Sequence, residues 1–206
     1  MKKILILPPL LFIISGCAGF IAGKYGVKKE TDKFNSNETK IIMTGGVIDL
    51  DYLGIVANQA EFNPLVIRSQ NNKIIETAIV FTFENNTTYT NDSWLNINQG
   101  DTAIFLLNGG SEKITLTAVK GDFDYSVTLP QSTVYTTKYD SGIFPITPDQ
   151  LKMIACANSI EIRVSGSSSS VDFPRKPNNH LLPSFLSNYR TFYENEVKPY
   201  LKPVTR

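Results

Sequence analysis

The chain has 206 residues, of which 42% are hydrophobic, 11% aromatic and 19% charged. This apolar content excludes an intrinsically disordered protein, and the formal net charge of +1 excludes a polybasic nucleic-acid binder. The length fits one globular domain plus a terminal segment, because a domain commonly holds about 150 residues. A domain of that size folds without disulfides or metal ions.

The N-terminus has the pattern of an export signal. Lys2 and Lys3 form a positive start, the apolar run 4–14 follows, and two small residues precede Cys17. The segment Ile14-Ser15-Gly16-Cys17 resembles the lipobox of bacterial lipoproteins. The resemblance implies that residues 1–16 are a cleaved signal peptide. It also implies that the Cys17 sulfur carries diacylglycerol and that fatty chains such as palmitate anchor the product.

This lipid predicts a location at the cell envelope, because two or three acyl chains give stable membrane binding. The next residue is Ala18 rather than aspartate, which by the same resemblance implies the outer membrane if the host has two membranes. Two other interpretations stay open. Residues 4–23 could form a transmembrane helix, although Pro8 and Pro9 would interrupt it. Alternatively, an ordinary signal peptide is removed and the cysteine stays free.

Residues 17–39 are expected to form the lipidated cysteine and a flexible tether, and residues 40–206 a single β-rich globular domain. The tether is rich in glycine, lysine, asparagine, serine and glutamate and has little apolar periodicity. A flexible segment of about twenty residues reaches roughly 25 Å, which clears the lipid headgroups.

Residues 40–139 show short β-branched and aromatic runs between turn residues, a pattern typical of an antiparallel sheet or sandwich. The clearest hairpin signal is the segment 108–111, because asparagine and glycine accept positive φ. Turns are also expected at Asn71-Asn72 and Gly121-Asp122. The strand-like runs are Lys40–Met43, Val47–Leu50, Leu65–Arg68, Ile74–Phe83, Trp94–Asn98, Thr102–Leu107, Lys113–Val119, Tyr125–Leu129 and Thr133–Tyr139.

The C-terminal third changes character. Thr147-Pro148-Asp149-Gln150 is a capping box that predicts a helix to about Ala157. The run Ser159–Ser165 alternates as a strand, and residues 166–170 are expected to be a flexible loop. An amphipathic helix is expected over Ser184–Leu201, with Pro199 ending or kinking it. The predicted fold class is therefore α+β, mostly antiparallel β, with two helices in the C-terminal third.

No convincing catalytic set is visible in the sequence. If Cys17 carries lipid, Cys156 has no partner in the chain and is expected to be a small, buried helix residue. A reactive thiol would need a nearby base, and His180 is the single histidine. One histidine and one spare cysteine do not make a zinc site. Accordingly, no metal and no cofactor are expected.

Two weaker candidates remain. Asp122 and Asp124 place two carboxylates on one side of an extended chain, as a glycosidase or a calcium site would need, although solvated side chains are the more common case. Trp94, Tyr135 and Tyr139 could form a surface on which a sugar stacks, although aromatic residues in strands are more often core.

The function expected from these observations is that of a non-enzymatic, lipid-anchored envelope protein that binds a protein or glycan partner and no nucleic acid. Membrane tethering favours a binding module because it raises the local concentration of that module. Two alternatives stay open. One is an enzyme acting on envelope polymers with Asp122 and Asp124, and the other is a structural subunit of an envelope assembly that uses the C-terminal helix as its contact.

Overall fold

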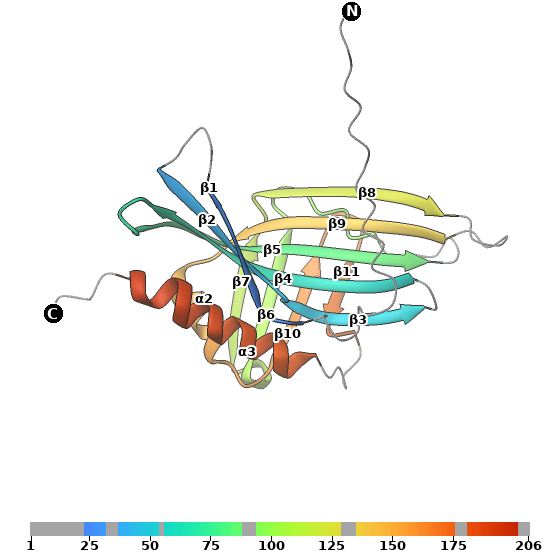
Figure 1. Ribbon diagram of the computed structural model, residues 1–206. Helices are drawn as coiled ribbons and strands as arrows, with labels where there is room; N and C mark the ends of the chain where they lie inside the picture. Colours follow the sequence, from blue (N-terminus) through green and yellow to red (C-terminus); the bar gives the residue numbers. More distant parts are fainter. Residues whose placement is uncertain are drawn as a thin grey trace, which may run out of the picture.

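The computed structural model describes residues 23–31, 37–53, 56–87, 94–128, 135–175 and 181–201. It contains two antiparallel sheets and two C-terminal helices, which confirms the predicted fold class (Figure 1). The expected signal peptide, Cys17 and His180 lie outside the described residues. No helix in the described part of the chain is long and apolar enough to cross a membrane.

The large sheet has seven strands in the order β1-β2-β4-β5-β9-β8, and β3 pairs with β4 beside β2. The expected hairpin at Asn71-Asn72 joins the two longest strands, and Asn72 has the positive φ of 57° that such a turn favours. The strands are β1 (Gly26–Thr31), β2 (Glu38–Thr44), β3 (Val47–Leu53), β4 (Val56–Ser69), β5 (Ile74–Thr87), β8 (Lys120–Thr128) and β9 (Tyr135–Pro145).

One edge of β4 changes partner along its length. Positions 56–61 of β4 pair with β3 and positions 65–69 pair with β2. Pro64, which has no N–H to donate, lies in the gap between the two partners. Gly46 fills this gap, since its carbonyl accepts the Phe62 N–H at 2.8 Å and a Cβ there would lie 2.1 Å from the Phe62 oxygen.

The small sheet has the order β11-β10-β6-β7, and its strands run steeply across those of the large sheet (Figure 1). The expected hairpin at Asn108 is confirmed, with a short 3-10 turn (Asn108–Gly110) between the strands. The serine-rich segment is not only a loop, because Ser170 opens a strand that pairs with β10. The strands are β6 (Thr102–Leu107), β7 (Glu112–Thr117), β10 (Ile160–Ser165) and β11 (Ser170–Phe173).

Phenylalanines from both sheets meet in the core. The ring centroid of Phe62 lies 5.8 Å from that of Phe105 and 5.7 Å from that of Phe173, both in edge-to-face geometry. Phe81 and Phe83 of β5 pack against Phe173 as well. Such aromatic pairs each add about 0.5–1.5 kcal/mol beyond the area they bury. The inner face of the large sheet is thus covered where the small sheet lies on it.

The helices cover another part of this inner face. The capping box is confirmed at α2 (Pro148–Cys156), where the Gln150 N–H donates to the Thr147 hydroxyl at 3.2 Å. The last helix is α3 (Leu182–Phe192), extended by a π turn (Tyr193–Val197) and a 3-10 turn (Lys198–Tyr200) that contains Pro199. The fully buried Tyr189 donates its hydroxyl to the Phe62 carbonyl at 2.9 Å.

Part of the expected tether is a strand. Residues 26–31 form β1, which pairs along its whole length with β2. The sequence of β1 shows little alternation of apolar and polar residues, because β1 is an edge strand and its last four side chains are exposed. Lys29 contacts Glu196 of the π turn at 3.2 Å, and Glu196 also binds the buried Arg68 at 2.8 Å. Strand pairing and this ion pair hold β1 on the domain.

Three other expectations are wrong. Gly121-Asp122 is not a turn but lies inside β8, because the chain passes from one sheet to the other just before Lys120. Trp94–Asn98 is not a strand, although Leu95 and Ile97 are buried between the sheets. Cys156 is exposed, not buried, because α2 turns its other side, with Leu151, Ile154 and Ala155, to the core.

Candidate functional site

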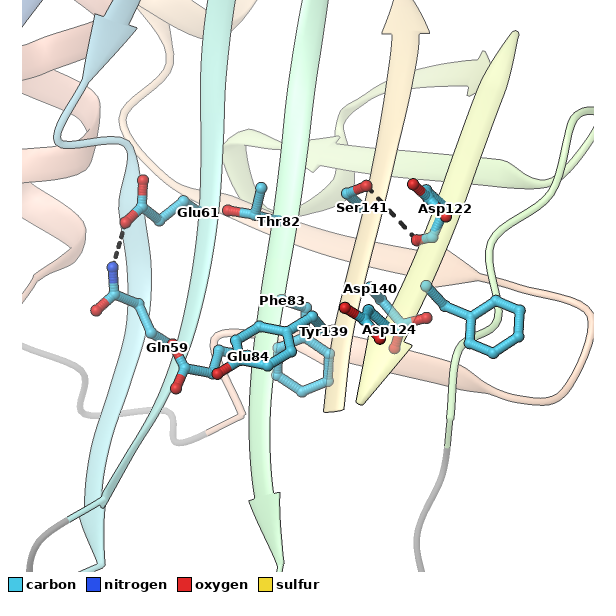
Figure 2. A pocket seen from close by; sticks show the side chains of 11 residues that line it. Gln59, Glu61, Thr82, Phe83, Glu84, Asp122, Asp124, Tyr139, Asp140 and Ser141 are labelled. Carbon is cyan, nitrogen blue, oxygen red and sulfur yellow. Dashed lines mark hydrogen bonds between the residues drawn. The ribbon is translucent and has the colours of Figure 1, made fainter. Parts of the chain in front are cut away.

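The outer face of the large sheet carries a groove of about 230 Å³. Four neighbouring strands, β4, β5, β9 and β8, contribute its side chains (Figure 2). Strand pairing explains the composition of the groove, because side chains directly opposite each other in neighbouring strands share a face. Two rows cross the sheet in this way. One row is Gln59, Glu84, Tyr139 and Asp124, and the other is Glu61, Thr82, Ser141 and Asp122.

Three aromatic residues line the groove, and Tyr139 is the one on the outer face of the sheet, since Phe83 and Phe123 belong to the inner face. The Tyr139 side chain is 42% exposed, although its neighbours in β9, Lys138 and Asp140, are buried on the opposite face. A phenol ring left open to solvent can stack on an apolar surface of a ligand, and its hydroxyl can donate or accept a hydrogen bond. This ring is the largest apolar group on the outer face of the groove.

Carboxylates surround this ring on three strands. Glu61 accepts hydrogen bonds from the amides of Gln59 and, at 2.7 Å, Asn63, so its carboxylate is held in place. Glu84 lies beside Tyr139 in the same row, and Asp122 and Asp124 lie on β8. Carboxylates accept hydrogen bonds only, so the groove favours ligands that donate them, such as hydroxyl and amino groups.

Asp122 and Asp124 therefore do lie on one side of an extended chain, as expected from their spacing. Both side chains are exposed, and the Asp124 carboxylate accepts the Tyr125 N–H at 2.8 Å. Gln59, Glu61 and Glu84 were not among the expected site residues. They lie about 40 to 60 positions earlier in the chain, and only the pairing of β4, β5 and β9 brings them to the aspartates.

The expected aromatic trio is not assembled. Trp94 lies on the inner side of β8 and β9, where its ring contacts Phe123 at 5.7 Å between centroids and Lys138 lies 4.8 Å from the ring centre. Tyr139 points to the outer face, so the two rings are separated by the sheet. The side chain of Tyr135 is outside the described part of the structure.

Asp140 lies near the groove, and the pKa of its carboxyl is shifted. Burial raises the pKa of this carboxyl, and backbone hydrogen bonds from Asn96 and Leu95 oppose the shift. The carboxyl accepts the Asn96 N–H at 2.8 Å and the Leu95 N–H at 3.3 Å. It faces away from the groove and holds the segment 94–98 against the sheet, which is a structural role.

A second hollow, of about 580 Å³, lies on the outer side of the small sheet. Apolar side chains of Ile104 and Leu106 line it, together with Arg163 and Asp172. These two charges neutralise each other in a two-fold ion pair at 2.6 and 2.7 Å. Lys113 and Glu161 add one charge of each sign, so the charges that line the hollow sum to zero. The groove with Tyr139 has an exposed aromatic ring beside an excess of carboxylates and is the stronger candidate.

Within the described ranges, no cluster of histidine, cysteine, aspartate and glutamate side chains has the arrangement of a metal site. Cys156 lies at the end of α2, on the opposite side of the large sheet from the groove, and takes no part in it. Comparison with family models, with curated proteins and with solved structures gives no match to this chain.

Proposed function

We propose that this protein is a lipid-anchored binding module of the bacterial envelope and that the groove on the large sheet holds a glycan. The observation that carries the proposal is the exposed ring of Tyr139 with carboxylates on both sides of it, on a rigid sheet. Sugar rings have apolar C–H faces that stack on aromatic rings and hydroxyl groups that donate to carboxylates.

The charge of the groove narrows the ligand class. Glu61, Glu84, Asp122 and Asp124 line it, and its described lining includes no lysine or arginine. An anionic polymer would be repelled there, because unpaired like charges cost binding energy. The ligand is therefore a neutral glycan or one that carries free amino groups.

The surroundings of the carboxyl groups favour binding over hydrolysis. A glycosidase needs one carboxyl that stays protonated near neutral pH to act as the acid. Burial raises the pKa of Asp140, but this carboxyl faces the inner side and accepts two backbone N–H groups. Asp122 and Asp124 are exposed to solvent, so neither lies in the apolar surroundings that such an acid needs.

The C-terminal helix offers less support for a role as an assembly contact. Its apolar side chains, Phe185, Tyr189 and Phe192, are fully buried within the chain itself. Removing this helix would therefore expose the core rather than an interface. The groove is the surface whose composition the fold does not explain.

The glycan proposal is tested by calorimetric titration of the full chain in detergent. The probes are maltohexaose as a neutral glycan, a hexamer of glucosamine as an amino-bearing one, and a hexamer of galacturonate as an anionic one. We expect binding of the first two, tightest for the glucosamine hexamer, and none of the third. Tyr139→Ala should weaken binding at least tenfold, whereas Tyr139→Phe should retain most of it because the ring remains.

The matched control is Tyr125→Ala, which removes an exposed tyrosine from the opposite face of the large sheet. It should leave glycan affinity within twofold of the parent. Equal affinities of Tyr139→Ala and the parent, or no binding of any neutral or amino-bearing glycan, would refute the proposal.

The anchor is tested separately. In the native host, Cys17→Ser should prevent lipid attachment and cleavage before residue 17, so the product should be heavier by the uncleaved segment and carry no acyl mass. Intact-mass spectrometry of the membrane fraction measures both. An unmodified Cys17 sulfur in the parent protein would overturn the lipid-anchor proposal and leave the groove argument untouched.

A further inference from the structure

The edge strand β8 differs from the other strand edges of the two sheets. In Figure 1 it lies at the border of the large sheet, and β9 is its one neighbour among the described strands. Three apolar side chains of β8 are about half exposed: Phe123 at 48%, Tyr125 at 59% and Val127 at 55%. They alternate with Asp122 and Asp124 and so share the inner face of the sheet, beyond the area that the small sheet covers.

Edge strands usually carry features that prevent pairing with another chain, such as charges, bulges or short length. The other edges of the described sheets have them. Strand β1 presents Lys28, Lys29 and Glu30, and β3 has a bulge near its start. Strand β11 has four residues, and the exposed side chains of β7 are all polar. Strand β8 has nine residues, pairs with β9 in one unbroken register, and contains no proline. It does carry charges, Lys120, Asp122 and Asp124, but these lie on the outer face and leave the row on the inner face apolar.

The apolar row of β8 is also held in place before any partner arrives. The Trp94 ring packs edge-to-face on Phe123 at 5.7 Å and on Tyr125 at 5.9 Å between centroids. Lys138 pairs with Tyr125 across the strands, and its ammonium lies 4.8 Å from the centroid of the same Trp94 ring. An aromatic row that is fixed but uncovered loses little conformational entropy when a partner covers it.

We propose that β8 pairs with β8 of a second copy of this chain, antiparallel and across a two-fold axis centred on Tyr125, so that the large sheets of two copies become continuous. A two-fold interface requires a surface that is complementary to itself. With Tyr125 opposite its own copy, Phe123 lies opposite Val127, which is a favourable aromatic and β-branched pair. All three apolar side chains of each copy then line the same face.

The charges of β8 select this register. With Tyr125 at the axis, Asp124 lies opposite Ser126 and Asp122 lies opposite position 128. An axis at Asp124 would place that aspartate opposite its own copy, and an axis at Phe123 would place Asp122 opposite Asp124. Like charges directly opposite each other destabilise a sheet. The Tyr125 register is the longest two-fold pairing of β8 that avoids both, with seven residues of each strand paired.

The Tyr125 N–H donates to the Asp124 carboxylate at 2.8 Å, and pairing at the axis has to displace this hydrogen bond. Because the interface is also small, the dimer is expected to be weak and reversible. Asp122, Phe123 and Asp124 of β8 also line the groove, but Tyr125 does not, and Tyr139 lies on β9 rather than on the pairing strand. Disruption of the dimer should therefore leave glycan binding intact, and loss of glycan binding in Tyr139→Ala should leave the dimer intact.

Sedimentation equilibrium of the full chain in detergent tests the pairing. Tyr125→Lys places two ammonium groups opposite each other at the axis and should raise the dimer dissociation constant at least tenfold. The matched control is Ile75→Lys, which changes another half-exposed apolar residue, on β5. It should change the constant less than twofold, and unchanged thermal unfolding of both variants would show that they fold.

Single cysteines introduced into the Cys156→Ser variant then test the register by disulfide formation. The Cys156→Ser variant itself is the reference, because any dimer that it forms on oxidation comes from Cys17. Tyr125→Cys should form a disulfide-linked dimer on mild oxidation, because position 125 lies opposite itself. Asp124→Cys and Ile75→Cys should each form at least tenfold less disulfide-linked dimer than Tyr125→Cys. A monomer at all concentrations, equal effects of both lysine variants, stronger crosslinking at position 124, or β8 pairing only with an extended segment of a different protein would each overturn the proposal.

Discussion

The two faces of the same four strands, β4, β5, β9 and β8, differ in what explains them. On the inner face, Phe62, Phe81 and Phe83 are at most 2% exposed and pack on the small sheet. On the outer face, Tyr139 and a set of carboxylates surround a groove. Packing within the chain accounts for these three rings. It does not account for the groove residues on the outer face, so a ligand is to be sought there.

The largest effect is expected from the inner face. Phe62→Ala removes a fully buried ring that contacts both Phe105 and Phe173. The substitution should lower the free energy of unfolding by about 3–5 kcal/mol, because it loses buried area and leaves a cavity. Urea denaturation measures this. A loss below about 1 kcal/mol would mean that the two sheets do not pack as described.

A smaller effect should follow from the contact between the helix and this sheet. Tyr189→Phe removes the buried hydroxyl that donates to the Phe62 carbonyl at 2.9 Å. Leaving a buried carbonyl without this donor should cost about 1–3 kcal/mol of unfolding free energy. Tyr139→Phe is the control, because its hydroxyl is on the exposed outer face and its loss should cost less than about 0.5 kcal/mol. Equal losses would contradict the difference between the faces.

The pH dependence of stability should report on Asp140. Burial raises the pKa of this carboxyl above its ordinary 3.8, so the folded protein binds its proton more tightly than the unfolded chain does. Its contribution to stability is therefore present at low pH and is lost as pH rises from about 4 through the folded-state pKa. Asparagine does not ionise, so Asp140→Asn should gain stability relative to the parent between about pH 3 and pH 7.

Urea denaturation at about pH 3 and about pH 7 measures the difference in unfolding free energy between parent and variant. The control is Thr82→Val, which changes a groove residue without a titratable group. Its difference in unfolding free energy from the parent should be the same at both pH values. If Asp140→Asn instead loses relative stability as pH rises, the hydrogen bonds from Leu95 and Asn96 outweigh the cost of burying the charge.

The smallest effects on stability are expected on the outer face. Glu84→Gln and Thr82→Val replace groove side chains that the core does not need, so each should change the unfolding free energy by less than about 0.5 kcal/mol. Glu84→Gln should nevertheless weaken binding of the glucosamine hexamer severalfold, because it removes one carboxylate from the groove. Stability losses as large as those on the inner face would show that the groove residues are structural.

Local patterns predicted those elements whose signals lie within a few residues. Asparagine and glycine at 108–111 indicate a hairpin because they accept positive φ, and Thr147 with Gln150 indicates a helix start because the two residues cap each other. The same patterns failed where an element depends on its place in the sheet rather than on its own sequence. Edge strand β1 lacks an apolar stripe, and Gly121-Asp122 resembles a turn although β8 runs through it.

The sequence by itself determined the fold class, the main hairpins and the two helices. It also determined that Asp122 and Asp124 lie on the same side of an extended chain. Each of these features depends on neighbours along the chain. Only the tertiary structure decided that Glu61 and Glu84 lie with these aspartates around Tyr139, and that Trp94 lies on the other side of the sheet. Strand order and register brought these residues together or apart. Both depend on contacts between residues distant in sequence, which local periodicity does not encode.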